Sequence, residues 1–226
     1  DLPVPSCWEE HEPDYEGVAW YARTIDVPDE WRGRHVRLQF DAVNARGEVW
    51  VNGDVVGYGE GGFTPVEFDV TQLLRYGQRN TLIVRVVGAA VRAERVNGIV
   101  RNEMPAWRGA YAGGIWQSVR LVVTDTVFVR DVFVEPCPAD AEAFVTVDLA
   151  NEAFQPIPDP QSAERVGSRR GPSVTSPIRS RRVGVRLEIT PAGEPGQVVA
   201  AHAEERTVEP GGCSFRVKLG FSTLVP

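Results

Sequence analysis

Residues 51–71, VNGDVVGYGEGGFTPVEFDVT, contain a glycine pattern that two very different folds could explain. Within it, Gly57, Gly59 and Gly62 have the G-x-G-x-x-G spacing that holds a dinucleotide pyrophosphate in a Rossmann turn. Such a turn needs a buried strand before it and a helix after it, whose free N–H groups meet the anion. The residues on either side of the glycines therefore distinguish a phosphate site from a β-structure.

Both flanks predict β-structure. Asn52-Gly53 is a strong signal for a two-residue type I′ hairpin turn, because these residues adopt positive φ angles most easily. Residues 63–70, FTPVEFDV, combine a proline with alternating apolar side chains, so they predict another strand and not a helix. We therefore expect Gly57 to Gly62 to let the chain bend tightly before residues 63–65, and not to bind phosphate.

The remainder of residues 1–124 follows the same pattern. Apolar and polar residues alternate, with turn residues between the segments, at residues 35–40, 66–70, 81–86 and 118–123. This pattern is typical of an all-β jelly-roll sandwich. One short helix is predicted at residues 71–76, with Thr71 as its N-cap and Gly77 as its left-handed C′ residue. Strands do not alternate with helices, which argues against a Rossmann domain or a (β/α)8 barrel.

Residues 125–226 predict a second β-sandwich. Strand patterns recur at residues 127–129, 132–135, 144–149 and 183–189. Residues 155–182 are rich in Pro, Ser, Gly and Arg, and they hold too few apolar groups to offset the entropy of ordering. We expect them to form a mobile insertion. About 75 residues then remain, fewer than the roughly 100 of an immunoglobulin-like sandwich, so we expect an incomplete domain of that type.

Composition argues against several classes of function. The net charge of −7 over 226 residues disfavours a general binder of nucleic acid or of an anionic membrane, since both need clustered positive potential. No apolar run approaches the roughly 20 residues that span a bilayer. Cys7, Cys137 and Cys213 form no C-x-x-C, and the 3 histidines form no H-x-x-x-H. We therefore predict no structural zinc site and no other cofactor.

The same residues bear on origin and compartment. An odd number of widely spaced cysteines fits a reduced compartment, the cytoplasm, better than a disulfide scaffold. Lys218 is the only lysine among 24 Lys and Arg residues, a bias expected of a GC-rich bacterial genome. The chain begins at Asp1 without methionine or a signal sequence, so we expect it to be a piece of a longer protein.

Six short motifs together resemble one enzyme family. They are PSCW (5–8), WYARTIDVP (20–28), EVWVNG (48–53), GGFTP (61–65), FDVT (68–71) and GIWQSV (114–119). In this order they resemble the N-terminal sugar-binding sandwich, of galactose-binding-like jelly-roll type, of glycoside hydrolase family 2. Residues 126–226 resemble the immunoglobulin-like domain that follows it in β-galactosidases, β-glucuronidases and β-mannosidases. The resemblance implies that the chemistry lies in a third domain, a (β/α)8 barrel, outside these residues.

Candidate site residues follow from the resemblance. The family's acid/base glutamate follows an asparagine, but Asn102-Glu103 and Asn151-Glu152 lie in loops or strand ends of predicted sandwiches, so we assign no catalytic residue. The loop before Gly113 reaches toward the barrel mouth in relatives. Aromatic faces suit a sugar ring, and amide, carboxylate and guanidinium groups suit its hydroxyls. We therefore expect sugar contacts from Asn102, Glu103, Trp107, Arg108 and Tyr111.

By contrast, we expect Trp20, Trp50 and Trp116 to be strand residues that pack in the core.

The leading hypothesis is that the chain is the non-catalytic N-terminal part of a family 2 β-glycosidase, with carbohydrate and its own barrel domain as partners. Two alternatives stay open, namely a free-standing lectin-like carbohydrate-binding module and a structural or oligomerisation domain. A homo-oligomer is compatible with each of the three.

Overall fold

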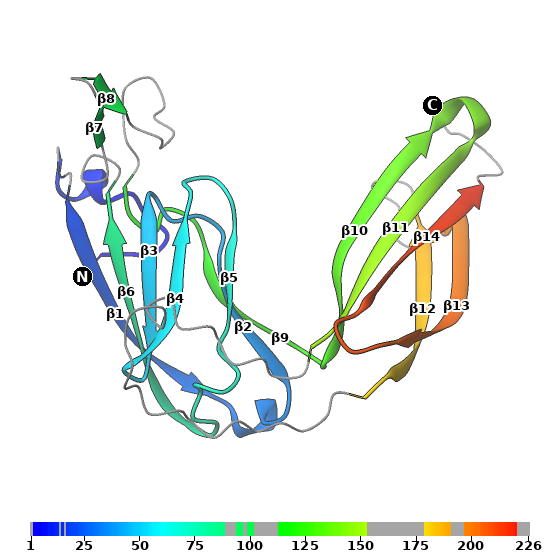
Figure 1. The fold of residues 1–226 in the computed structure, drawn as a ribbon, viewed down its shortest axis with the longest axis horizontal. Coiled ribbons are helices and arrows are strands. Elements are labelled where there is room, and N and C mark those ends of the chain that lie inside the picture. The colour runs from blue at the N-terminus through cyan, green and yellow to red at the C-terminus, as the bar shows by residue number, and fades with distance from the viewer. Residues whose placement is uncertain are drawn as a thin grey trace. The chain divides into compact units, whose positions relative to one another are not determined.

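A computed structural model describes residues 2–13, 15, 17–88, 94–96, 99–101, 113–152, 179–190 and 197–220. These residues fall into two compact units, with the boundary between Val123 and Thr124. Both units are built from antiparallel strands, which confirms the all-β fold class (Figure 1). In the described part of the chain, no helix has the length and apolar character needed to cross a membrane.

The first unit is a sandwich of two sheets. Its helices are the 3-10 turns η1 (Trp8–Glu10) and η2 (Asp29–Trp31). Its strands are β1 (Val18–Val27), β2 (His35–Phe40), β3 (Arg46–Val51), β4 (Asp54–Glu60), β5 (Val66–Asp69), β6 (Gln78–Val87), β7 (Glu94–Val96), β8 (Ile99–Arg101) and β9 (Val119–Thr124). One sheet has the order β1-β6-β3-β4 and the other β5-β2-β9, while β7 and β8 pair with each other.

The core of this unit lies between the two sheets. Alternate side chains point inward because successive residues of a strand face opposite sides of the sheet. The inward residues are mostly valine, whose branched side chain suits a pleated surface. The fully buried members include Val36, Phe40, Val49, Val51, Val56, Val70 and Val86.

Residues 51–54 form the predicted hairpin turn. Asn52 has φ 54° and Gly53 φ 92°, and Val51 pairs with Asp54, so β3 and β4 are joined by a two-residue turn. No helix follows Gly62, which confirms that the glycines do not form a phosphate loop. The bend was predicted to include Gly57 to Gly62, but Gly57 and Gly59 belong to β4, which continues to Glu60. The bend therefore involves fewer residues than predicted.

Gly59 is required for close packing and not for a bend. A Cβ atom at this position would lie 2.3 Å from Cγ1 of Val66 on β5. The glycine therefore lets β4 approach β5 of the facing sheet without a side chain between them.

The predicted helix at residues 71–76 does not form, and hydrogen-bonded turns take its place. The backbone groups that a helix would use are satisfied by side chains and by β1. Asn52 Nδ2 donates to Leu73 O at 2.8 Å, and Gly77 N donates to Val27 O at 2.9 Å. Gly77 does take the left-handed conformation, with φ 71°. Competition from polar side chains thus overrides the local helical preference.

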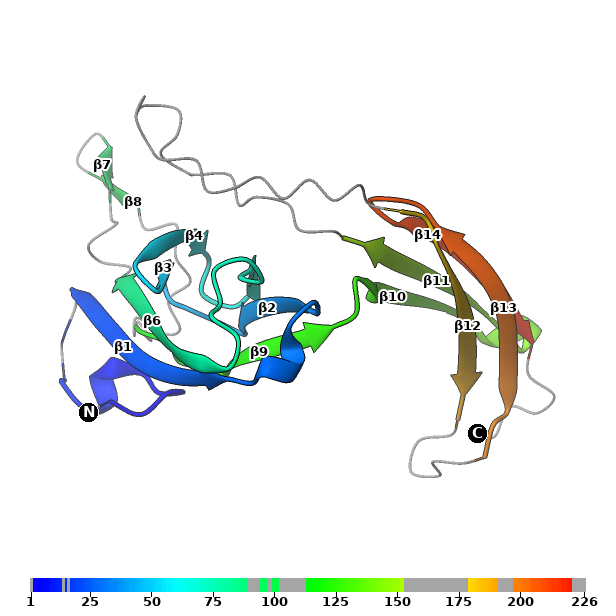
Figure 2. The ribbon, with the colours of Figure 1, turned by 90° about the horizontal axis from the view of Figure 1, so that it is seen from below.

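The second unit has a smaller sandwich, whose layers are also seen in Figure 2. It consists of β10 (Val127–Cys137), the 3-10 turn η3 (Pro138–Asp140), β11 (Glu142–Asn151), β12 (Arg181–Ile189), β13 (Ala200–Val208) and β14 (Cys213–Gly220). The sheet orders are β10-β11-β14 and β12-β13. Val145, Val147 and Leu149 of β11 lie in its core.

The predicted insertion overlaps the described part of this unit only at its end. Residues 155–178 lie outside the described residues. Arg181 and Arg182 belong to β12 and pair with Val208 and Thr207 of β13. The last two residues of the predicted insertion therefore belong to the strand.

Candidate functional site

The five residues predicted to contact sugar, Asn102, Glu103, Trp107, Arg108 and Tyr111, lie outside the described residues. The structure describes the chain on both sides of them. Strand β8 ends at Arg101 on one side, and the chain is described again from Gly113 on the other.

The chain at Gly113 is held by hydrogen bonds to the N-terminal segment. The Gly113 N–H donates to both carboxylate oxygens of Glu9, at 2.9 and 3.1 Å. Its carbonyl accepts from the Trp8 N–H at 3.2 Å, and Gly114 exchanges two backbone bonds with Asn44, at 3.0 and 3.1 Å. Hydrogen bonds to an ionised carboxylate are stronger than those between neutral groups. This end of the segment that holds the candidate residues is therefore fixed to the sandwich.

Sequence reasoning missed the role of Trp8 and Glu9 in this anchor. Trp8 is only 3% exposed, and its ring contacts that of Tyr15 edge-to-face at 5.4 Å between centroids. Glu9 and Gly113 are 104 positions apart in the chain. The motif PSCW at residues 5–8 marks the position, but nothing in the sequence names its distant partner.

Two of the recognised motifs meet each other in space. Nε1 of Trp116 donates to the carbonyl of Gly62 at 2.8 Å. The Trp116 ring also contacts that of Phe63, with centroids 5.3 Å apart and ring planes at 70°. Trp116 is half-buried and lies before β9, so the prediction that it is a strand residue of the core is wrong.

The FDVT motif at residues 68–71 is a structural network. The Thr71 hydroxyl donates to Oδ1 of Asp69 at 2.6 Å, and it accepts from the Val36 N–H at 2.9 Å. The Thr71 N–H also donates to Oδ1 of Asp69, at 2.9 Å. Oδ2 of Asp69 lies 3.5 Å from Nε2 of His35, whose side chain is fully buried. Together these contacts join the end of β5 to β2.

This network makes a prediction about pH. Burial alone would raise the pKa of Asp69, but hydrogen bonds from His35 and Thr71 outweigh it, so the pKa is lowered. A carboxyl whose pKa is lower in the folded state stabilises the fold fully above its unfolded value of about 3.9. This contribution is lost as the pH falls through the lower folded value.

We therefore expect Asp69→Asn to lower the free energy of unfolding at neutral pH and to flatten its dependence on pH below about 4. Urea unfolding of both proteins over an acidic pH series measures the effect. Asp26→Asn, at a side chain that is 84% exposed, is the matched control. Parallel stability curves for Asp69→Asn and the unsubstituted chain would contradict the assignment.

The Asn-Glu pair within the described residues is also structural. Asn151 is 2% exposed, and its Nδ2 donates to the carbonyls of Val208 and Arg179, at 2.9 and 3.1 Å. Glu152 forms an ion pair with Arg130, 2.5 Å apart. Asn151 therefore secures the end of β11 against the chain before β12 and at the end of β13.

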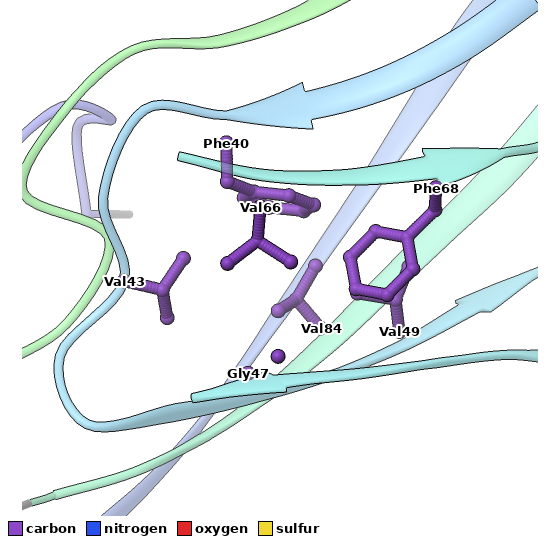
Figure 3. Close-up of a pocket in the computed structure, with 8 residues that line it drawn as sticks. Phe40, Val43, Gly47, Val49, Val66, Phe68 and Val84 are labelled. Carbon is purple, nitrogen blue, oxygen red and sulfur yellow. The ribbon is translucent and has the colours of Figure 1, made fainter. Parts of the chain in front are cut away.

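A small apolar pocket lies between the sheets of the first unit (Figure 3). Its lining is Phe40, Val43, Gly47, Val49, Gly59, Val66, Phe68 and Val84. Its volume is about 10 Å³, which is room for a single water and far too little for a sugar ring. It is a packing defect of the core and not a ligand site.

Two of the three tryptophans predicted to pack in the core, Trp20 and Trp50, lie on the outer surface of the first unit. The Trp20 side chain is 62% exposed and Trp50 is half-buried, and their ring centroids are 5.5 Å apart. The prediction that they pack in the core is therefore wrong. Alternation along β1 and β3 predicts which residues share a face, but it does not tell which face of the sheet is covered.

Comparison with known sequences identifies relatives of the first unit. The family description "Glycosyl hydrolases family 2, sugar binding domain" matches residues 3–125. A β-galactosidase of Thermoanaerobacter pseudethanolicus is 32% identical over 123 residues, which cover 54% of this chain and 16% of that protein. A β-glucuronidase of Bacteroides fragilis is 27% identical over 169 residues, 67% of this chain and 23% of that protein. The chain thus spans less than a quarter of either relative.

Solved structures share the fold over both units. A glycosyl hydrolase family 2 member from Bacteroides cellulosilyticus matches 96% of this chain and 27% of its own, with a TM-score of 0.63 and 19% identity. A β-glucuronidase from Bacteroides uniformis matches 97% of this chain and 24% of its own, with a TM-score of 0.62 and 17% identity. Since the family description covers more than half of the 226 residues, the chain belongs to glycoside hydrolase family 2 and contains its N-terminal sugar-binding domain.

Proposed function

We propose that the chain is the non-catalytic N-terminal part of a family 2 β-glycosidase. In this role it positions and shapes the active site of a (β/α)8 barrel elsewhere in the same protein. The observation that carries the proposal is the match of residues 3–125 to the sugar-binding domain of the family. The relatives named β-galactosidase and β-glucuronidase, of which 16% and 23% are matched, support a longer parent enzyme.

The chemistry of the described residues agrees with a non-catalytic role. Retaining hydrolysis of a glycoside needs two carboxyl groups about 5–5.5 Å apart, one as acid/base and one as nucleophile. Glu152, the glutamate of the one described Asn-Glu pair, is instead held by Arg130 next to the buried Asn151. We assign it a structural part, and we assign the hydrolysis to the barrel.

Sugar contacts are proposed for the segment between β8 and Gly113. Trp107 and Tyr111 would pack against the apolar face of a sugar ring, while Asn102, Glu103 and Arg108 would bind its hydroxyls. The hydrogen bonds of Gly113 to Glu9 and Trp8 support this proposal, because a contact residue loses less entropy on binding when its segment starts from a fixed point.

Calorimetric titration of the purified chain with galactose, glucuronic acid and mannose tests the proposal against its alternatives. If the chain contacts sugar only together with a barrel, the purified chain alone should bind each monosaccharide with a dissociation constant above the millimolar range. Binding at millimolar or tighter affinity that is lost in Trp107→Ala would favour a free-standing lectin-like module. Stable assembly in light scattering without sugar binding would favour a structural or oligomerisation domain.

A further inference from the structure

The outer surface of the sheet β1-β6-β3-β4 carries an unusual set of side chains. In the register of the sheet, Trp20, Arg85, Glu48 and Tyr58 form one row across the four strands. The next row contains Ala22, Ile83, Trp50 and Val55. We call these two rows, with Arg46 and Glu60 beside them, the aromatic face. Four strands spaced by about 4.8 Å make a surface roughly 14 Å wide, which is larger than a single sugar ring.

Large apolar groups on this face are open to solvent. Trp20 is 62% exposed, Val55 50% and Tyr58 47%. The rings of Trp20 and Trp50 lie at 32° to each other with centroids 5.5 Å apart, so they form one tilted aromatic surface. Exposed aromatic side chains gathered in this way indicate a binding surface more often than chance, whereas single exposed apolar residues need no explanation.

Charged groups run through the middle of the aromatic face and balance each other. Nη1 of Arg85 lies 2.7 Å from Oε2 of Glu48, and Nε of Arg46 lies 3.1 Å from Oε1 of the same glutamate. Nη1 of Arg46 lies 3.0 Å from Oε1 of Glu60. The two arginines and two glutamates sum to zero charge. The face therefore has no net charge with which to attract an ionic ligand.

The cations are also placed against the rings. The Arg46 guanidinium lies 4.0 Å from the centroid of the Tyr58 ring, and that of Arg85 lies 5.9 Å from the Trp20 ring. These contacts favour one arrangement of the aromatic and the polar groups. Because these side chains are already arranged, ordering them when a ligand binds costs less free energy.

This mixture suits a neutral sugar better than a second protein surface. An apolar protein surface would bury the ion pairs of Glu48 without offering hydrogen-bond partners to their remaining donors and acceptors, which costs free energy. Sugar hydroxyls both donate and accept hydrogen bonds, so they can satisfy guanidinium and carboxylate groups at once. The C–H face of the sugar ring meanwhile packs on indole.

We propose that the aromatic face binds a neutral oligosaccharide, with its sugar rings on Trp20 and Trp50 and its hydroxyls on Arg85 and Glu48. This binding surface goes beyond the proposed function and uses none of residues 102–111. It gives the chain a way to hold a polymeric carbohydrate independently of the active site.

Titration of the 226-residue chain with β-1,4-linked galacto- and gluco-oligosaccharides, followed by calorimetry and tryptophan fluorescence, tests the proposal. We expect binding that is unchanged between low and high salt, because neither the aromatic face nor the oligosaccharide carries net charge. Trp20→Ala and Trp50→Ala should each raise the dissociation constant about tenfold or more, because each substitution removes an aromatic ring that packs on a sugar. Phe63→Ala, at an aromatic residue that is 52% exposed outside the face, is the control and should keep full affinity.

Three results would overturn the proposal. One is that none of the oligosaccharides binds to the chain. Another is that Trp20→Ala and Trp50→Ala both bind with full affinity while Trp107→Ala does not, which would leave the proposed function intact. The third is that the chain elutes as an oligomer that Trp20→Ala separates into monomers, which would make the face a protein interface. Circular dichroism of each variant confirms that it is folded.

Discussion

Trp8→Ala should destabilise the first unit by about 3–5 kcal/mol, the range for the removal of a large buried aromatic side chain. Trp8 is 3% exposed and lies over three glycines that have no side chain to fill the space it would leave. A Cβ atom would lie 3.0 Å from the Trp8 ring at Gly88 and 2.0 Å from it at Gly113. Urea unfolding followed by circular dichroism measures the loss.

The exposed Trp20 provides the matched control. At 62% exposure, Trp20→Ala should change the free energy of unfolding by less than about 0.5 kcal/mol. Gly113→Ala alone should also destabilise, by about 1–3 kcal/mol, because the new methyl group overlaps the Trp8 ring. In the Trp8→Ala background the same change should cost less, since the ring is gone. Strict additivity of the two substitutions would contradict the packing of Trp8 against Gly113.

Asn80→Ala should cost the first unit about 2–4 kcal/mol, because it leaves several buried polar groups without a partner. The side chain is 1% exposed. Its Oδ1 accepts from Nδ2 of Asn52 at 2.7 Å and from the Arg75 N–H at 2.8 Å. Its Nδ2 donates to the carbonyls of Arg75 and Gln78, at 3.0 and 2.9 Å.

Asn80 thus links the hairpin turn at Asn52 to the turns of residues 71–77. Thermal and urea unfolding of the variant measure its contribution. Thr81→Ala, at the exposed neighbouring position, is the control and should stay within about 0.5 kcal/mol of the unsubstituted chain. A loss below about 1 kcal/mol for Asn80→Ala would show that water replaces these hydrogen bonds without cost.

Much of the fold could be predicted because its signals are local. Asn52-Gly53 fixes the turn between β3 and β4 through the φ angles that it adopts, and alternation marks the strands around it. The helix predicted at residues 71–76 failed because Asn80 and Asn52 compete for its backbone groups. Neither asparagine is adjacent to that segment, so local propensity could not reveal the competition.

The candidate site was predictable in part only. The motifs of residues 61–65 and 114–119 were recognised separately, but the bond of Trp116 to Gly62 that unites them depends on the folded chain. The anchor of Gly113 to Glu9 is likewise a long-range contact. The exposure of Trp20 depends on which face of β1 is covered, and alternation leaves that choice open.

If the chain is the non-catalytic part of a family 2 β-glycosidase, as proposed, it should not hydrolyse a glycoside by itself, and an assay of turnover measures this. The purified chain and its Glu103→Gln and Glu152→Gln variants are incubated with the nitrophenyl β-glycosides of galactose, glucuronic acid and mannose. We expect no release of nitrophenol above the rate in buffer from any of the three proteins. Sustained turnover by the chain, whether or not the two substitutions abolish it, would contradict the account.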